Sequence, residues 1–335
     1  MSGGVDSSVA AALLKKQGYF VIGIFMKFWK EGKSAENRCC SVESEKLARL
    51  VAKKIGIPFY VINVEKEFKK KVVDYFLKEY KKGNTPNPCV VCNKEIKFGF
   101  LINKALKMGA ELIATGHYAQ MKNNKLLKGK DKEKDQSYFL WQLNQKKLSR
   151  VLFPVGKYKK TEVRKIAKEM ELPTAQTPES QEVCFIQNTT NDFLKKYLKT
   201  KPGNIIDVSG KILGKHQGLW FYTIGQRKGI GFSGGPYFVV AKDLKNNNLI
   251  VSKNQKDLES KQLIVKNVNW TNPPKLPFQA EIKIRYKSNI ATAKISDFGK
   301  NKVKIFFQKP QKAITPGQSV VFYRNQELLG GGVIE

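Results

Sequence analysis

Acidic residues are scarce in this 335-residue chain, in which 28 Asp and Glu stand against 61 Lys and Arg. The resulting net charge of +33 is unlike that of an ordinary enzyme surface. It predicts a polyanionic partner, because neutralising phosphates releases counterions. The excess is not confined to a tail, since residues 262–335 have 12 Lys and Arg against 4 Asp and Glu. A folded basic body favours structured nucleic acid over a membrane surface, although a lysine-rich codon usage is an alternative source of the excess.

Long hydrophobic runs are also missing. The apolar run from Tyr19 to Phe25 is short and is soon followed by Lys27, so it predicts a buried strand and neither a signal peptide nor a membrane span. Cysteine is limited to five residues, an odd number. In a large basic chain this predicts a cytoplasmic protein whose thiols are kept for chemistry or packing.

The chain has two regions with different sequence patterns. Up to about residue 115, short β-rich runs alternate with helical runs such as 43–55 and 68–80, which is typical of a parallel α/β sheet. A further helix is predicted within residues 157–170, with Thr161 as its N-cap. Beyond residue 200 the chain has Gly-rich turns. Its last part, after the Pro pair at 273–274, has short strands at regular spacing, which predict a small barrel or sandwich.

The chain begins with Ser-Gly-Gly-Val-Asp-Ser-Ser at residues 2–8, directly before a helix. Two glycines let backbone N–H groups approach an anion, and the helix N-terminus adds positive potential. Asp6 would repel a bare phosphate, so its presence suggests Mg²⁺ between the two. A Gly-Lys-Ser/Thr sequence is missing, which excludes a Walker A loop. The stretch resembles the loop of the PP-loop ATP pyrophosphatases, which cleave ATP between the α and β phosphates; alone, Ser-Gly-Gly would fit an ordinary capped helix start.

In that superfamily a hydrophobic strand precedes the loop and lies in the middle of the sheet. Here Met1 stands directly before Ser2. A sheet without its central strand would leave ladder groups unpaired. We therefore expect that the true start of the protein lies upstream of Met1.

Later motifs distinguish between members of the superfamily. The relevant stretches are FMKFW (25–29), TPNPCVVCNKEIKFG (85–99), ATGHYA (114–119), KDQSYFL (134–140), FPVG (153–156), VCFI (183–186), GKHQGLWFYTIGQRKGIG (214–231) and ITPGQSVVFY with LGGGVIE (314–335). In this order they resemble the tRNA-specific 2-thiouridylase family, which converts the wobble uridine (position 34) of tRNAs for Lys, Glu and Gln to 2-thiouridine. The resemblance implies an α/β, doubly wound parallel-sheet pyrophosphatase domain at 1–190, a small β-rich central domain at 191–258 and a C-terminal β-barrel at 259–335. The last two domains would grasp tRNA.

The residues suit that chemistry. Uracil O2 is a poor leaving group, and adenylation by ATP with Mg²⁺ turns it into departing AMP. A sulfur nucleophile must then attack C2, for which a thiolate or persulfide is suited. By resemblance, Cys184 is the persulfide carrier and Cys92 the partner nucleophile. From its apolar neighbours alone, Cys184 would equally be a buried structural thiol.

The resemblance implies further contacts. ATP would be bound by Met1, Ser2, Gly3, Gly4, Val5, Asp6, Ser7, Ser8, Met26 and Gly116. The tRNA or its target base would be contacted by Asn87, Pro88, Cys89, His117, Lys134, Asp135, Gln136, Arg285, Tyr286 and Gln318. From the residues alone, His117 would equally be a structural histidine at a strand end, and Arg285-Tyr286 an exposed cross-strand pair.

The spacing of Cys89 and Cys92, with two residues between them, allows other interpretations. A redox pair or half of a zinc site is typical of such spacing, but a second pair is missing, so zinc would need distant ligands. Cys89 stands where many family members have Asp, and it is a possible accessory residue. Cys89, Cys92 and Cys184 together would offer three ligands for an iron–sulfur cluster. The adjacent Cys39 and Cys40 are interpreted as structural or incidental.

Two other functions remain open from the sequence. One is a different PP-loop synthetase acting on a small molecule, which would not explain the charge or the β-rich tail. The other is a non-catalytic tRNA-binding protein that holds nucleotide as a structural ligand. A sulfur donor is expected as a second partner, either a cysteine desulfurase or a relay protein.

Overall fold

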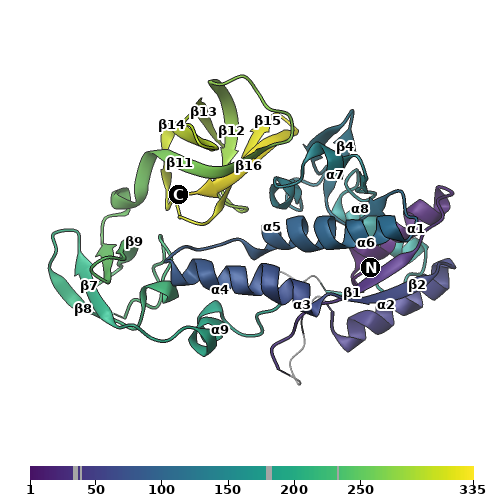
Figure 1. The fold of residues 1–335 in the computed structure, drawn as a ribbon, viewed down its shortest axis with the longest axis horizontal. Helices are drawn as coiled ribbons and strands as arrows, with labels where there is room; N and C mark the ends of the chain where they lie inside the picture. Colours follow the sequence, from purple (N-terminus) through teal and green to yellow (C-terminus); the bar gives the residue numbers. More distant parts are fainter. Residues whose placement is uncertain (33–36, 38–39, 179–182, 232–233) are drawn as a thin grey trace.

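The computed structural model describes residues 1–32, 37, 40–178, 183–231 and 234–335. Figure 1 shows an α/β region built from the N-terminal half, a small sheet of the middle region and a barrel of the C-terminal part. The prediction of an α/β domain followed by two β-rich parts is confirmed. Among the described residues, none of the helices has both the length and the apolar composition needed to cross a bilayer.

The α/β region contains helices, short parallel strands and the antiparallel β4–β5 hairpin. Its elements are α1 (Val5–Lys16), β1 (Gly23–Lys27), α2 (Val42–Ile55), β2 (Phe59–Asn63), α3 (Glu65–Phe68), η1 (Lys69–Val73), α4 (Asp74–Lys81), α5 (Pro88–Cys92), η2 (Asn93–Phe100), α6 (Leu101–Lys107), β3 (Ile113–Ala114), β4 (Ala119–Lys122), β5 (Lys125–Lys128), η3 (Ser137–Leu140), α7 (Gln145–Leu148), β6 (Val151–Leu152), α8 (Lys160–Glu169) and α9 (Thr190–Tyr197). Local signals explain the bounds of α2, since Ser41 accepts a hydrogen bond from Ser44 N and Gly56 ends the helix in the left-handed conformation.

The predicted N-cap of α8 is wrong. Thr161 lies inside the helix, and Lys159 occupies the N-cap position. The side chain of Glu162 accepts a hydrogen bond from Lys159 N, so an acidic residue in the first turn satisfies the exposed backbone donor instead of a threonine hydroxyl.

The parallel strands form two separate pairs. β1 pairs with β2, and β3 pairs with β6. Among the described residues, no strand pairing joins these two pairs into one sheet. The amino group of Met1 donates a hydrogen bond to Ile24 O of β1. Burial of the amino group lowers its pKa to about 5. The N-terminal residue therefore lies against the inner edge of the first pair.

The remaining strands make two antiparallel or mixed sheets. The middle sheet contains β7 (Gly203–Asp207), β8 (Ile212–His216), β9 (Phe238–Asp243) and β10 (Asn248–Ser252), with the short helices η4 (Leu219–Phe221) and η5 (Gln255–Leu258) beside it. The barrel contains β11 (Glu259–Trp270), β12 (Phe278–Lys283), β13 (Ala291–Asp297), β14 (Lys302–Lys312), β15 (Ser319–Arg324) and β16 (Glu327–Ile334). Pairing of β11 with both β14 and β16 closes the barrel, which leaves no free edge among these six strands.

The barrel is joined to the α/β region by both backbone and side chains. The β4–β5 hairpin extends the barrel sheet, because Leu127 of β5 pairs with Glu327 of β16. Trp141 is fully buried in a core that also contains Tyr323 and Leu328 of the barrel. A side chain at Gly331 would collide with the Trp141 ring, at 2.9 Å. The two parts therefore share one hydrophobic core.

We predict that Trp141→Ala lowers the free energy of unfolding by about 3–5 kcal/mol, because it empties a large space in the shared core. Leu112→Ala is the matched control, since Leu112 is 38% exposed in the same region and its truncation should cost less than about 1 kcal/mol. Chemical denaturation, followed by the circular dichroism of the backbone, measures the free energy of unfolding of both variants. Equal losses for the two variants would contradict a shared core centred on Trp141.

Candidate functional site

The N-terminal loop, residues 1–8, packs closely against the start of α2. Gly3 has φ 72°, and a side chain there would lie 2.3 Å from Ser44 O, so only glycine fits. Ser2 N donates to Ser7 Oγ at 3.1 Å, and Ser7 Oγ donates to Gly4 O at 3.0 Å. The loop ends at the N-terminus of α1, where backbone N–H groups and the helix dipole favour an anion.

Gly116 lies directly against this loop, although more than a hundred residues separate the two. A side chain at Gly116 would be 2.6 Å from Asp6 C and 2.7 Å from Ser7 N. The residue follows β3, so the end of that strand closes over the start of α1. Met26 lies on β1 and is half-buried. The structure thus brings Gly116 to the loop.

Asp6 has two partners that the sequence reasoning missed. Lys160 Nζ lies 2.7 Å from Asp6 Oδ1 and 2.9 Å from Oδ2, and the Tyr118 hydroxyl donates to Oδ1 at 2.7 Å. Lys160 and Tyr118 are both buried. The ammonium group neutralises the carboxylate and so removes the repulsion that a bare Asp6 would exert on a phosphate. Lys160 is one lysine of a lysine-rich stretch, and its pairing over such a sequence distance follows from the fold alone.

The helix that contains Cys92 has a well-defined start. Asn87 is the N-cap of α5, where its side chain accepts a hydrogen bond from Val90 N at 3.3 Å, and Pro88 follows at the first helical position. Cys89 is exposed and Cys92 is half-buried. Beyond Cys92 the helix continues as the π-helix η2, a form that is frequent at functional sites.

Cys92 and Cys184 pack against the same hydrophobic core. We call its aromatic members the aromatic cluster: Phe28, Phe68, Phe76, Tyr80, Phe185, Phe193 and Phe221. Cys40 also packs there, with its thiol 3.2 Å from Phe28 N, which agrees with a structural role; Cys39 lies outside the described residues. The fold therefore places both predicted sulfur residues against one core, although they lie far apart in the chain.

The barrel fixes the segment that leads into α5. Thr85 N donates to Pro316 O at 2.9 Å, and Gln318 Nε2 donates to Thr85 O at 2.7 Å. Tyr286 stacks on Phe139 with ring centroids 4.5 Å apart, while Arg285 is exposed. Gln318 and Tyr286, two predicted tRNA residues, therefore also hold the α/β region and barrel together beside Asn87.

Three other predicted tRNA residues make contacts within the protein. His117 is buried, its Nδ1 lies 2.7 Å from Thr115 Oγ1, and burial lowers its pKa well below the usual value. Asp135 is buried and accepts hydrogen bonds from Gly129 N and Ser137 N. Gln136 accepts a hydrogen bond from Tyr118 N at 3.0 Å. Of the predicted Lys134–Gln136 contact, Lys134 is half-exposed.

The cysteines do not belong to a set of side chains arranged for metal binding in the described residues. Across the residues that the structure describes, no group of three or more His, Cys, Asp or Glu side chains could hold a metal ion. Cys89, Cys92 and Cys184 therefore do not form a three-ligand set in this conformation. Neither the zinc interpretation nor the iron–sulfur interpretation has a ready site here, and we derive no chemical step through a metal cluster.

Comparison with protein families gives three consecutive matches. Residues 1–188 match the model described as a tRNA methyl transferase HUP domain, residues 191–253 the tRNA methyl transferase PRC-barrel domain and residues 260–334 the aminomethyltransferase beta-barrel domain.

Comparison with curated proteins gives matches over the whole chain. A protein of Thermoanaerobacter sp. (strain X514) is 48% identical over 351 aligned positions, which cover 100% of this chain and 96% of that protein. Proteins of Carboxydothermus hydrogenoformans and Clostridioides difficile are each 46% identical, with the same coverage. All three are named tRNA-specific 2-thiouridylase. With full-length identity at this level, the chain belongs to the tRNA-specific 2-thiouridylase family.

Proposed function

We propose that this protein is a tRNA-uridine 2-sulfurtransferase that thiolates the wobble uridine, position 34, of tRNAs for Lys, Glu and Gln. The observation that carries the proposal is the common position of Cys92 and Cys184 on one core, combined with a glycine loop of the nucleotide-binding type. The proposed substrates are tRNA and ATP with Mg²⁺, the proposed sulfur donor is a cysteine desulfurase or a relay protein, and the proposed location is the cytoplasm.

In the first step, the N-terminal loop and Gly116 would hold ATP so that uracil O2 attacks its α-phosphate. Pyrophosphate leaves, and O2 becomes part of an AMP leaving group. Backbone N–H groups at the start of α1 supply fixed donors toward the phosphates. Lys160 acts as a positioning residue, because it holds Asp6 neutralised at the end of the loop. Mg²⁺ would accompany the phosphates.

In the second step, the terminal sulfur of a Cys184 persulfide would attack C2 and displace AMP. The Cys92 thiolate would then attack the Cys184 sulfur, forming a Cys92–Cys184 disulfide and releasing the sulfur with the base as 2-thiouridine. A thiol reductant would restore both cysteines. Asn87 and Pro88 at the start of α5 would meet the target base. Cys89, exposed one position beyond, would be an accessory thiol at that entrance.

The central prediction concerns the two cysteines. Cys184→Ser should abolish 2-thiouridine formation while it leaves ATP- and tRNA-dependent pyrophosphate release intact, because adenylation precedes sulfur transfer. Thionucleoside analysis of tRNA after incubation with ATP, Mg²⁺ and a sulfur source measures the first, and a pyrophosphate assay measures the second. Cys40→Ser is the matched control, since Cys40 packs against the same core. If Cys184→Ser still produced 2-thiouridine, the persulfide assignment would be wrong.

A second prediction concerns Lys160. Lys160→Met should reduce pyrophosphate release by roughly 100-fold or more, as expected when one preorganised charge contact is lost from a site. Lys160→Arg should restore part of the rate because it keeps the positive charge. In the Met variant Asp6 keeps the Tyr118 hydroxyl but has lost its cation, so the double variant Asp6→Asn/Lys160→Met should bind ATP more tightly than Lys160→Met alone.

The control for this prediction is Lys54→Met. Lys54 is exposed and forms a surface ion pair with Glu171 in the same region. Equal rates for Lys160→Met and Lys54→Met would show that the Asp6–Lys160 pair has no part in adenylation.

A further inference from the structure

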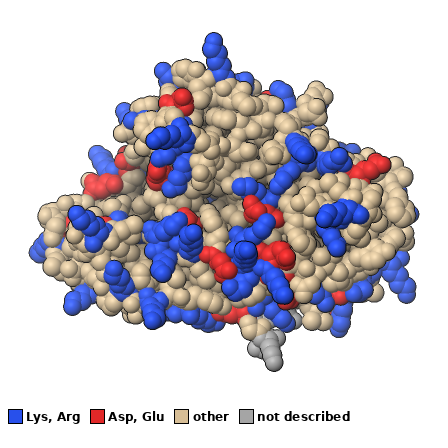
Figure 2. Space-filling model, viewed as in Figure 1, with Lys and Arg blue, Asp and Glu red and all other residues tan. Residues whose placement is uncertain are grey.

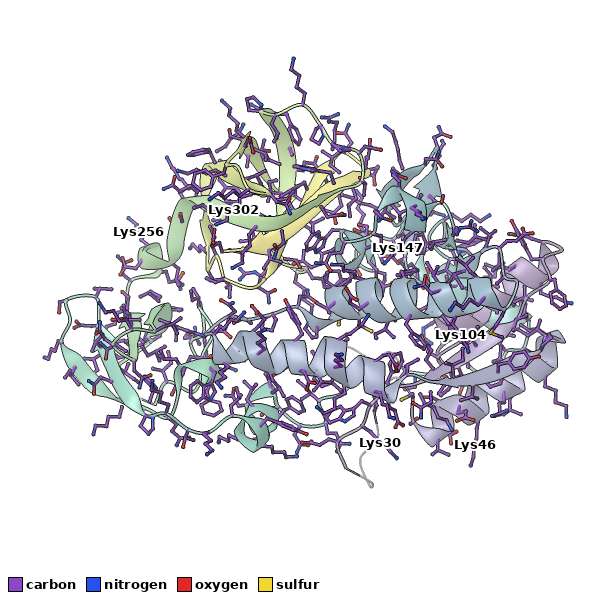
Figure 3. The ribbon with its side chains drawn as sticks, in the orientation of Figure 1. Lys30, Lys46, Lys104, Lys147, Lys256 and Lys302 are labelled. Atoms are coloured by element: carbon purple, nitrogen blue, oxygen red, sulfur yellow. The ribbon has the colours of Figure 1, made fainter. Side chains whose placement is uncertain are left out.

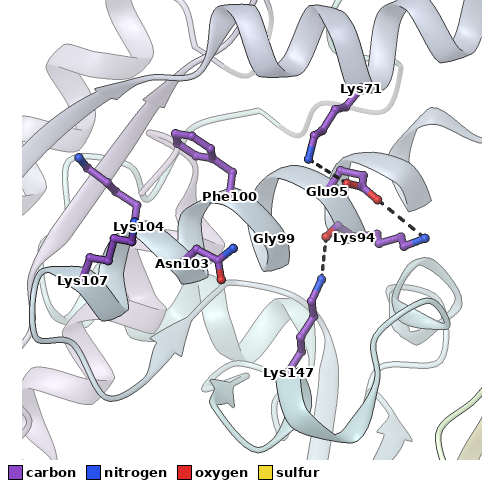
Figure 4. A pocket seen from close by; sticks show the side chains of 9 residues that line it. All are labelled: Lys71, Lys94, Glu95, Gly99, Phe100, Asn103, Lys104, Lys107 and Lys147. Atoms are coloured by element: carbon purple, nitrogen blue, oxygen red, sulfur yellow. Dashed lines mark hydrogen bonds and ion pairs between the residues drawn. The ribbon is translucent and has the colours of Figure 1, made fainter.

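A basic pocket lies beside the helix that contains Cys92. We call it the lysine pocket; its volume is about 440 Å³, and its cations are Lys71, Lys94, Lys104, Lys107 and Lys147. Figure 4 shows that they come from η1, from the η2–α6 helix and from α7, and that Lys147 points toward Lys94. Glu95 is the one acidic residue in its lining. Lys71 and Lys94 are ion-paired with Glu95, and the remaining positive charges favour an anion in this pocket.

The geometry of the pocket keeps its charges close together. Lys147 Nζ donates to Lys94 O at 3.2 Å, and Lys71 Nζ lies 3.1 Å from Glu95 Oε2. Gly99 permits this arrangement, because a side chain there would lie 2.7 Å from Lys94 O, the atom to which Lys147 donates. Burial lowers the pKa of Lys147, with Lys94 and Lys71 adding to the effect and Glu95 opposing it. An anion that entered would relieve the repulsion among these ammonium groups.

The position of the pocket relates it to the sulfur chemistry. Lys94 follows Cys92 by two residues, where α5 passes into η2. Lys104 lies on α6, beyond the kink at Phe98. Figure 3 places Lys104 and Lys147 over the α/β region, well away from Lys256 at the opposite side of the molecule. A polymer with regularly spaced negative charges could therefore reach the pocket while one of its units lies near Cys92.

The lining favours a nucleic acid over a protein partner. Protein interfaces are depleted of charged residues at their core, whereas interfaces with nucleic acids are strongly positive. The half-buried ring of Phe100 and the amide of Asn103 lie among the lysines, and such aromatic and amide groups suit bases next to a bound backbone. Figure 2 shows that Lys and Arg dominate over Asp and Glu across the face of the molecule that it displays.

We propose that the lysine pocket binds phosphodiester groups of the tRNA strand next to the nucleotide that is presented to Cys92. This inference rests on the proposed function for the identity of the RNA. The pocket would hold the anticodon-arm backbone in register without reading its sequence, since phosphate contacts position a nucleic acid and base contacts specify it.

The test is the salt dependence of tRNA binding to the full-length protein. Lys104→Ala/Lys147→Ala should reduce the slope of log Kd against log[KCl] by about 1.4, because each lost contact with a single-stranded phosphate lowers it by about 0.7. The KM for tRNA should rise several-fold while kcat is retained. The matched control is Lys46→Ala/Lys53→Ala, which removes two exposed lysines from α2. Lys104→Glu, at an exposed position, serves as the second variant if the double variant unfolds.

Each outcome of these binding and KM measurements either supports the proposal for the lysine pocket or overturns it. An unchanged slope and KM, or equal changes in the α2 control, would overturn the proposal. Unchanged tRNA binding with slower sulfur transfer from a protein donor would also overturn it, and would assign the pocket to the donor. If the wild-type protein makes no 2-thiouridine, the proposed function fails, whereas the binding slopes still decide whether the pocket holds RNA phosphates.

Discussion

Burial of the aromatic cluster is the constraint on which the arrangement of the site depends. Its rings come from segments between Phe28 and Phe221 and contact one another edge-on, as in the pairs Phe76–Phe185 and Phe68–Phe185 at 5.4 and 5.8 Å. Such pairs add about 0.5–1.5 kcal/mol each beyond the burial of their area. Because Cys184 directly precedes Phe185, anchoring this ring also anchors the thiol, and Cys92 packs against the same surface from α5.

The barrel is a structural part of the site as well as a candidate surface for RNA. Trp141 and Gly331 pack together in the shared core, while Thr85 is held by hydrogen bonds to Pro316 and Gln318. Asn87, the cap of α5, therefore stands where the two parts meet. Loss of the barrel would release the segment that leads into α5, so the barrel and the positioning of Cys89 and Cys92 are physically linked.

Charge is distributed in two different ways. At the N-terminal loop, a buried lysine neutralises Asp6 one to one, at hydrogen-bond distance. In the lysine pocket, cations gather around a single glutamate and leave a positive excess. The first arrangement fixes a side chain and exerts little field beyond it, whereas the second produces a field that acts on a polyanion at a distance and weakens with salt.

The sequence by itself determined the class of fold and the order of the three parts, because these depend on local patterns and on long motifs. It also indicated the N-terminal loop, because the glycine at position 3 is visible in the sequence. It also indicated Cys92 and Cys184 as a pair, but only through resemblance. The tertiary structure alone decided that both cysteines lie on one aromatic core, that Lys160 and Tyr118 hold Asp6, that His117 and Asp135 are buried and that five lysines surround one pocket. The physical reason is the sequence separation over which each interaction acts. Capping, periodicity and turn formation act within a few residues, whereas these contacts join segments that only the packing of the whole chain brings together.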